Sequence, residues 1–151
     1  MAEKVAEGDR ICVVLGVNIV EGSIVSAVRR FVRQPRGAKV LLKEVPDAER
    51  FGVAEVRNGR VVSIVEKPKR PKSRLAVTGI YFYDRRVFEV VRGLRPSGRG
   101  ELEITDVNNA YIERGELTWD LLEGWWTDAG TFESLRRATN LVAETGANKL
   151  D

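Results

Sequence analysis

The sequence contains no histidine, one cysteine, one methionine and no long apolar run. Without histidine, the chain has no Ser-His or Cys-His pair, no histidine metal ligand and no side chain that ordinarily titrates near neutral pH. Cys12 has no second cysteine with which to form an internal disulfide, and the apolar run around it predicts a buried, unreactive thiol. Any chemistry must therefore depend on carboxylates, cations and positioning.

Membrane and secretion signals are also lacking. No apolar run approaches the roughly 18 residues of a membrane-spanning helix, and the first nine residues, MAEKVAEGD, are polar and acidic, unlike a secretory signal. We therefore expect a cytoplasmic protein. The 151 residues, 43% hydrophobic and 31% charged, predict one globular domain over residues 1–151. A net charge of +3 suits an anionic small ligand as well as nucleic acid.

Apolar strands alternate with amphipathic helices along the chain. This pattern predicts an α/β fold with a mixed, mostly parallel sheet and helices on both faces. The continuous apolar run Ile11–Leu15 predicts a strand that is buried on both faces. Asn58-Gly59 predicts a type I′ β-hairpin over residues 53–65, with Val56 opposite Val61. Thr131 and Gly146 are predicted to begin and end the last helix.

Ligands of such sheets bind beyond the carboxyl ends of strands, which points to residues 16–18, 66–67 and 126–128. The Glu66 carboxylate suits paired sugar hydroxyls and the Lys67 ammonium suits a phosphate, although the two also fit a solvent-facing ion pair at a strand end. Asp128 lies just ahead of a helix cap. It could bind Mg²⁺ together with substrate phosphates, or belong to an ordinary helix-entry turn.

Two basic segments have alternative interpretations. The run from Lys67 to Arg74 fits an anion funnel, a nucleic-acid patch or a solvated loop, and it has no interleaved aromatic residue on which a base could stack. Arg99 stands between two glycines, where a bare backbone can approach a phosphate closely, or where the chain simply turns.

Taken together, these segments resemble the glucose-1-phosphate thymidylyltransferases, within the sugar-phosphate nucleotidyltransferases. The resemblance extends from about Asp9 to Asn148. It rests on motifs in the family's order: Val-Leu-Gly-x-Asn (to 18), Arg-Phe-Gly-Val (50–53), Glu-Lys-Pro (66–68), Val-Thr-Gly-Ile-Tyr-Phe-Tyr-Asp (77–84), Arg-Gly-Glu-Leu-Glu-Ile-Thr-Asp-Val-Asn (99–108) and Trp-x-Asp-x-Gly-Thr (126–131).

The resemblance implies a partial Rossmann-like nucleotidyltransferase fold and a reaction, in which a sugar 1-phosphate and dTTP give dTDP-sugar and pyrophosphate. It also implies roles for single residues. Lys67 and Arg99 would hold the sugar phosphate, and Asp128 would ligate Mg²⁺. The remaining site residues would line, support or cover the sugar pocket: Gly52, Glu66, Val77, Gly79, Tyr81, Glu101 and Trp126.

The sequence departs from the family pattern at two points. Val17 stands where the family has a second metal-binding aspartate, which implies a severe loss of metal-assisted catalysis. The family's Gly-x-Gly-Thr-Arg-Leu loop is not found in the 151 residues. We therefore expect the C-terminal, sugar-binding portion of the fold without its nucleotide-binding part, weak or inactive alone, or else a non-catalytic sugar-phosphate-binding, regulatory or assembly module.

The strand Ile11–Leu15 would then lie at an apolar sheet edge. We expect a second copy or a partner chain to cover this edge, whereas a nucleic-acid partner is not favoured.

Overall fold

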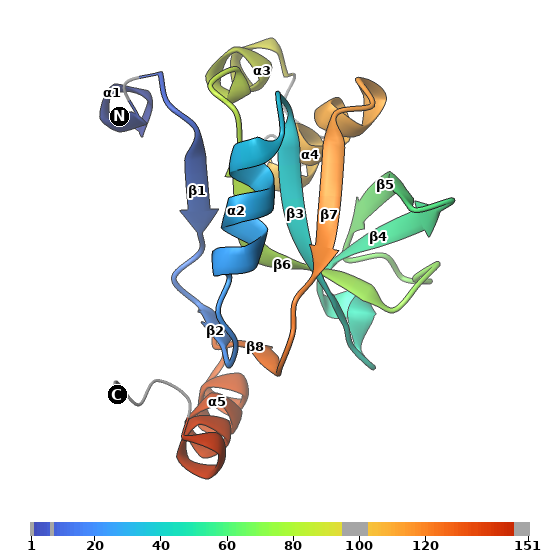
Figure 1. Cartoon of the computed structure of the whole chain (residues 1–151). Helices are drawn as coiled ribbons and strands as arrows, with labels where there is room; N and C mark the ends of the chain where they lie inside the picture. Colours follow the sequence, from blue (N-terminus) through green and yellow to red (C-terminus); the bar gives the residue numbers. More distant parts are fainter. Residues whose placement is uncertain (1, 7, 95–102, 147–151) are drawn as a thin grey trace.

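The computed structural model describes residues 2–6, 8–94 and 103–146. A six-stranded sheet has the strand order β5-β4-β6-β3-β7, with β1 paired to β6, and β2 and β8 form a separate two-stranded sheet (Figure 1). The strands are β1 (Ile11–Val14), β2 (Asn18–Val20), β3 (Ala38–Glu44), β4 (Gly52–Arg57), β5 (Arg60–Glu66), β6 (Leu75–Tyr83), β7 (Leu117–Leu121) and β8 (Trp126–Asp128).

Helices cover both faces of the main sheet. The helices of the described residues are α1 (Ala2–Ala6), α2 (Val25–Arg33), the short 3-10 helix η1 (Ala48–Arg50), α3 (Val87–Gly93), α4 (Ile104–Glu113) and α5 (Phe132–Thr145), of which α2, α3 and α4 contribute to the cores of the main sheet. Phe31 of α2 packs with Leu41 and Phe82 in one core, whereas Val90 of α3 and Tyr111 of α4 belong to a second core. The predicted α/β class, with helices on both faces, is confirmed.

The expectation of a mostly parallel sheet is wrong. β3 and β7 form the parallel pair, and the other pairs of the main sheet are antiparallel. The reason is β6, which runs antiparallel to each of its neighbours β1, β3 and β4. Alternation of strands and helices predicts crossovers, but it does not reveal a long central strand that runs against its neighbours.

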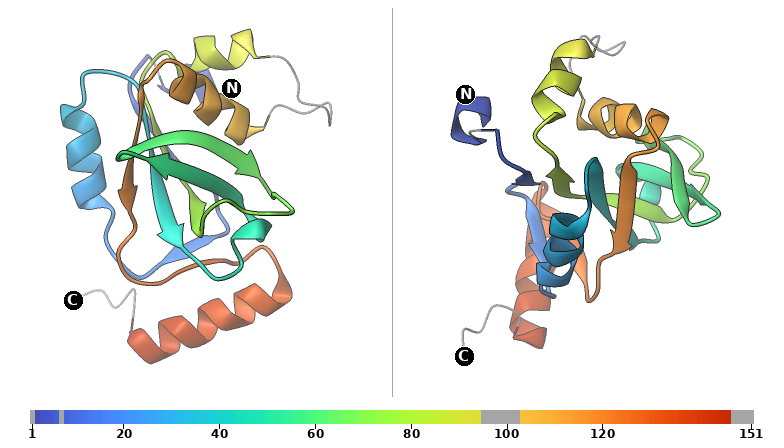
Figure 2. Two further views of the ribbon diagram at one scale, coloured as in Figure 1. Left: turned by 90° about the vertical axis from the view of Figure 1, so that its right-hand side faces the viewer. Right: turned by 45° about the horizontal axis from the view of Figure 1, so that its top comes forward.

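The predicted hairpin is present. Asn58 and Gly59 have φ angles of 50° and 74°, and Val56 lies opposite Val61, as a type I′ turn requires. The Trp119 indole of β7 donates a hydrogen bond of 2.9 Å to the Gly59 carbonyl, so the hairpin tip reaches back to the strand at the far end of the sheet order. The sheet is therefore strongly curled (Figure 2).

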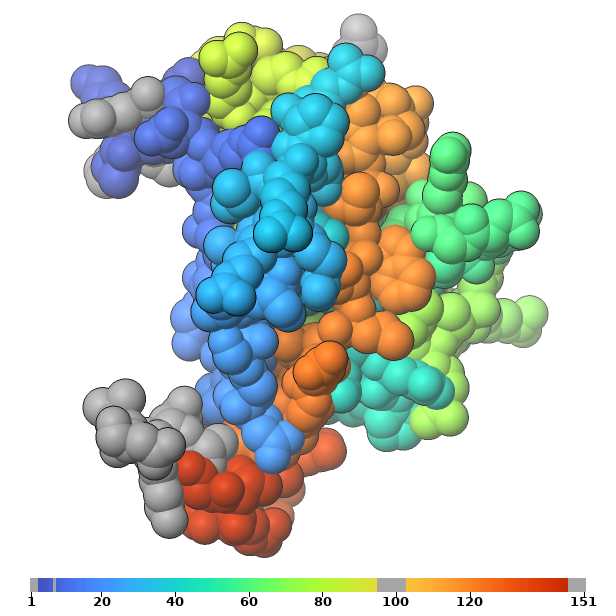
Figure 3. Space-filling model, in the orientation of Figure 1, coloured from blue at the N-terminus to red at the C-terminus, as the bar shows by residue number. Residues whose placement is uncertain are grey.

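The strand β1 differs from its prediction. Ile11 and Val13 are half-buried, whereas Cys12 and Val14 are exposed, so the strand is not buried on both faces and the thiol is not in the core. The main sheet continues on one side of β1, through β6, and β1 lies at the margin of the molecule between α1 and α5 (Figure 3). Within the described residues, the other edge of β1 is unpaired.

The last helix begins and ends as predicted. The Thr131 hydroxyl accepts a hydrogen bond from the Ser134 backbone, and Gly146 adopts a left-handed conformation, with φ 67°, directly after the helix. Across the described parts of the chain, no helix combines the length and the apolar character that crossing a bilayer requires.

Candidate functional site

A cavity of about 540 Å³ lies at the ends of β1, β5 and β8 and beside the middle of β6. Its size is in the range typical of small-molecule sites. It brings together most of the predicted site residues: Gly52, Glu66, Lys67, Val77, Gly79, Tyr81, Trp126 and Asp128. The two others, Arg99 and Glu101, lie outside the described residues.

The wall at Glu66 is built by the β4–β5 hairpin. Gly52 lies directly opposite Glu66 in the register, and a Cβ atom at Gly52 would come within 3.2 Å of a Glu66 carboxylate oxygen. Glycine here leaves room beside the carboxylate. Thr105, buried in the first turn of α4, donates a hydrogen bond of 3.0 Å to Glu66 Oε2 and orients it. The other carboxylate oxygen has no partner among the described residues and is available to a ligand.

The floor of the cavity is formed by Tyr81, which is 5% exposed. Burial, together with the smaller effect of the nearby negative charge of Glu66, raises the pKa of its hydroxyl to about 12. Tyr81 is therefore a neutral hydroxyl at every physiological pH, suited to hydrogen bonding rather than proton transfer.

Asn18 connects three walls of the cavity. Its Oδ1 accepts hydrogen bonds from the Gly79 backbone at 3.0 Å and from the Trp126 indole at 2.8 Å, and its Nδ2 donates to the Leu15 carbonyl at 2.9 Å. A Cβ atom at Gly79 would overlap the Asn18 amide. Asn18 thus fixes Trp126, whose ring is 5.0 Å from that of Phe51.

Lys67 occupies a strained backbone position at the rim. Its φ of 43° is unusual for a residue other than glycine, and its backbone N–H donates to the Phe51 carbonyl at 3.0 Å. This turn directs the chain away from the sheet directly after Glu66. The Lys67 side chain is exposed and makes no ion pair with a described residue, so its charge is available to an anion.

Asp128 is held next to Asn18 by the two-stranded sheet, in which the two residues lie opposite each other. Its Oδ1 accepts a hydrogen bond of 2.7 Å from the Gly130 N–H. Val17 is close by, because its carbonyl accepts a 2.7 Å hydrogen bond from Ala129, but its side chain offers no oxygen. The described residues contain no group of three or more metal-ligating side chains.

This donor set fits Mg²⁺ only as an ion held by one protein carboxylate, Asp128, together with substrate phosphates and water.

Sequence reasoning missed part of the cavity wall. Residues 16–18 were expected at the site, but Asn18 was given no role, and Arg50 and Phe51 were not expected in the wall although they lie within an identified motif. Their roles depend on β2, β8 and η1, which are short and were not predicted. Thr105 likewise lies in a recognised motif, and only the packing of α4 against β5 places it beside Glu66.

The sequence profile of the nucleotidyl transferase family matches residues 1–145. The chain belongs to this family.

Among its relatives, a glucose-1-phosphate thymidylyltransferase from Neisseria meningitidis is 47% identical over 146 residues, which is 94% of this chain and 51% of that protein. A low-salt glycan biosynthesis nucleotidyltransferase from Haloferax volcanii is 39% identical, over 86% of this chain and 37% of that protein.

Solved structures agree on the fold. A crystal structure from Bacillus anthracis, assigned to the glucose-1-phosphate thymidylyltransferases and complexed with sucrose, is 51% identical and superposes with a TM-score of 0.89, over 99% of this chain and 59% of that one. A UDP-glucose pyrophosphorylase bound to UDP-glucose has a TM-score of 0.82 at 21% identity, over 95% of this chain and 59% of that one, a likeness of fold alone.

The chain spans about half the length of the curated relatives it matches. These comparisons do not bear out the narrower expectation that the matched part is a C-terminal portion.

Proposed function

We propose that this chain forms the sugar-phosphate side of a nucleotidyltransferase site for the reaction of glucose 1-phosphate with dTTP. The observation that carries the proposal is that one cavity holds three charged side chains. They are the Glu66 carboxylate, of which only one oxygen accepts a hydrogen bond from a described residue, the Lys67 ammonium group, which has no ion-pair partner among the described residues, and the Asp128 carboxylate. The chain's similarity to glucose-1-phosphate thymidylyltransferases supports this choice of substrate.

Each of these groups has a part in the proposed binding. The unpaired Glu66 oxygen accepts hydrogen bonds from sugar hydroxyls, and Thr105 keeps that carboxylate in position. Lys67 attracts the phosphate at the rim, with Arg99 as a second proposed cation. Trp126 forms an apolar wall against the sugar ring, held in place by its bond to Asn18. Gly52, Val77, Gly79 and Tyr81 shape the pocket, with Glu101 as a further proposed support.

The proposed chemistry requires no general base. A phosphate oxygen of the sugar phosphate is already anionic, so it attacks the α-phosphorus of the nucleotide directly, and pyrophosphate leaves with the electron pair of the broken P–O bond. The protein's contribution is alignment and charge neutralisation. A bound Mg²⁺ would neutralise phosphate charge, with Asp128 as its one proposed protein ligand. The residues that bind the nucleotide would lie outside these 151 residues.

The second candidate function is a non-catalytic module that binds a sugar phosphate or assembles with an active chain. Val17 favours it, because a lone carboxylate holds Mg²⁺ weakly. In either case we propose that the open edge of β1 pairs with a strand from a second copy or a partner chain, because an unpaired apolar edge is a template for strand addition. We further propose that the protein acts in the cytoplasm.

Isothermal titration calorimetry with glucose 1-phosphate tests the binding proposal. Lys67→Ala should weaken binding roughly tenfold, as expected for the loss of one charge-assisted contact of about 1.4 kcal/mol. Lys69→Ala is the matched control, because Lys69 is also exposed, is two residues away and is not part of the cavity wall. Equal affinities for the two variants would contradict the proposal.

Pyrophosphorolysis of dTDP-glucose with Mg²⁺ separates the two candidate functions. Turnover that disappears in Asp128→Ala supports the enzyme. Binding of glucose 1-phosphate without turnover supports the module.

A further inference from the structure

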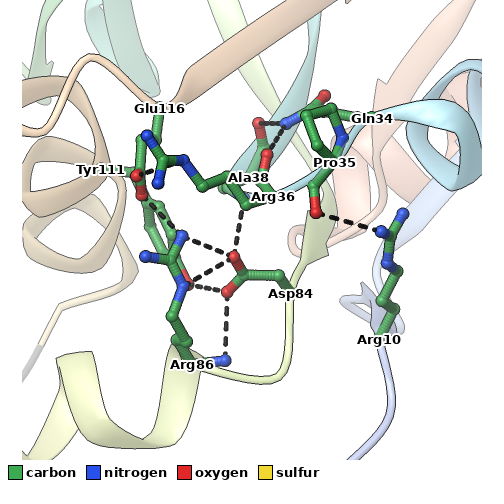
Figure 4. Close-up of polar contacts among 10 residues, drawn as sticks. Arg10, Gln34, Pro35, Arg36, Ala38, Asp84, Arg86, Tyr111 and Glu116 are labelled. Atoms are coloured by element: carbon green, nitrogen blue, oxygen red, sulfur yellow. Dashed lines mark hydrogen bonds and ion pairs between the residues drawn. The ribbon is translucent and has the colours of Figure 1, made fainter.

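A second cavity, also of about 540 Å³, lies at the opposite end of β1 and β6 from the candidate functional site. Three segments that are distant in sequence form it: residues 8–10 before β1, residues 35–36 between α2 and β3, and residues 84–86 after β6. Arginine side chains dominate its wall, namely Arg10, Arg36, Arg85 and Arg86 (three of them in Figure 4). We call it the arginine cavity.

The arginine cavity has a fixed anchor. Asp84, 5% exposed, accepts hydrogen bonds from the Gly37 N–H, the Tyr111 hydroxyl and both the backbone and the guanidinium of Arg86. Arg86 also bonds Glu116 at 2.6 Å, and Glu116 pairs with Arg36 at 3.0 Å (Figure 4). These contacts hold two guanidinium groups at the wall while leaving several of their N–H donors unused.

Arg10 is held by a different arrangement. Its guanidinium donates to the carbonyls of Phe31 and Val32 at the end of α2, at 2.9 and 2.8 Å, and lies over the Phe31 ring. These partners carry no full negative charge, so the positive charge of Arg10 is not cancelled by a carboxylate. Arg85 is exposed and has no ion-pair partner among the described residues.

The balance of charge at the arginine cavity is positive. Asp84 and Glu116 offset Arg36 and Arg86, and the remaining acid at the wall, Asp9, faces two unneutralised arginines. Guanidinium groups held in place by other contacts bind tetrahedral oxyanions well, because little side-chain freedom is lost on binding.

We propose that the arginine cavity is a binding site for an inorganic oxyanion of the phosphate class, separate from the proposed sugar-phosphate site. Arg85 and Arg10 supply the attraction, Arg36 and Arg86 supply oriented N–H donors, and Asp9 limits the affinity by repulsion.

Calorimetric titration with pyrophosphate and with inorganic phosphate tests this site. All variants are made in a Lys67→Ala background, so that binding at the other cavity contributes little and failure of one proposal is distinguishable from failure of the other. Arg85→Ala should weaken pyrophosphate binding roughly tenfold. Arg29→Ala is the control for loss of one charge, because Arg29 is also exposed and lies on α2 away from the arginine cavity.

Asp9→Asn supplies an effect of the opposite sign. Removing its negative charge should strengthen pyrophosphate binding several-fold, a gain that damage to the fold would not produce. The proposal is overturned if Arg85→Ala and Arg29→Ala bind pyrophosphate equally, if Asp9→Asn gives no gain, or if the Lys67→Ala protein binds neither anion.

Discussion

Replacement of Asn18 by alanine is the sharpest test of how the candidate functional site is held together. The substitution removes the acceptor of the Gly79 N–H and of the Trp126 indole N–H, and the donor to the Leu15 carbonyl. Gly79 is buried and Trp126 is 7% exposed, so both N–H groups lose a partner in places that water reaches poorly. The Leu15 carbonyl lies at an exposed residue and can bond water instead.

The magnitude follows from these three groups. An orphaned buried donor costs about 1–3 kcal/mol, so two cost about 2–6 kcal/mol, and the exposed carbonyl adds little. Because both lost bonds are only partly buried, we expect the lower part of this range, a loss of about 2–4 kcal/mol in the free energy of unfolding. With a typical urea dependence of about 2 kcal/mol per molar, the unfolding midpoint should fall by about 1–2 M. Asn18→Asp keeps the acceptor but loses the donor, so its unfolding midpoint should lie between those of the alanine variant and the parent.

Urea unfolding followed by tryptophan fluorescence measures these differences. Asn140→Ala is the matched control, because Asn140 is exposed on α5 and makes no hydrogen bond with a described residue. A midpoint for Asn18→Ala within about 0.25 M of the Asn140→Ala midpoint, a difference of about 0.5 kcal/mol, would refute the reasoning.

Three further predictions concern titration and metal binding. All three tyrosines of the chain have raised pKa values, chiefly through burial. Absorbance at 295 nm should therefore show no phenolate at pH 10, with Tyr81 ionising at about 12, and tyrosine titration near pH 10 would contradict this burial. Burial alone would raise the pKa of Asp84, but hydrogen bonds from Arg86, Gly37 and Tyr111 lower it, so the stability it gives is present above about pH 4 and is lost as the pH falls through its folded-state pKa. Asp84→Asn should flatten acid unfolding curves, and an unchanged slope would count against that account. Val17→Asp should tighten Mg²⁺ binding in the presence of glucose 1-phosphate at least tenfold, as measured by calorimetry. The control is Val62→Asp, since Val62 lies on the hairpin and is about as exposed as Val17; equal Mg²⁺ affinities of the two variants would argue against Asp128 as a metal ligand.

The sequence predicted the local features that depend on a few adjacent residues. The Asn58-Gly59 turn and its register, and the Thr131 and Gly146 helix ends, follow from backbone preferences that act within one turn. Strand direction did not follow, because the antiparallel course of β6 is decided by packing between distant segments.

The candidate site was predictable as a set of motifs, but its internal supports were not. The bonds from Thr105 to Glu66 and from Asn18 to Trp126 join residues 39 and 108 positions apart, and no local pattern encodes such distances. Cys12 was predicted to be buried and is exposed, because an apolar run is buried only where a neighbouring element covers it.

Backbone amide shifts during an NMR titration with glucose 1-phosphate test the central claim most directly. If the sugar phosphate binds between Glu66 and Lys67, the amides of Gly52, Lys67 and Gly79 should shift together with a single affinity, while Gly37 beside the arginine cavity stays unchanged at low ligand concentration. Saturable binding that leaves all three of these amides unshifted would contradict the account.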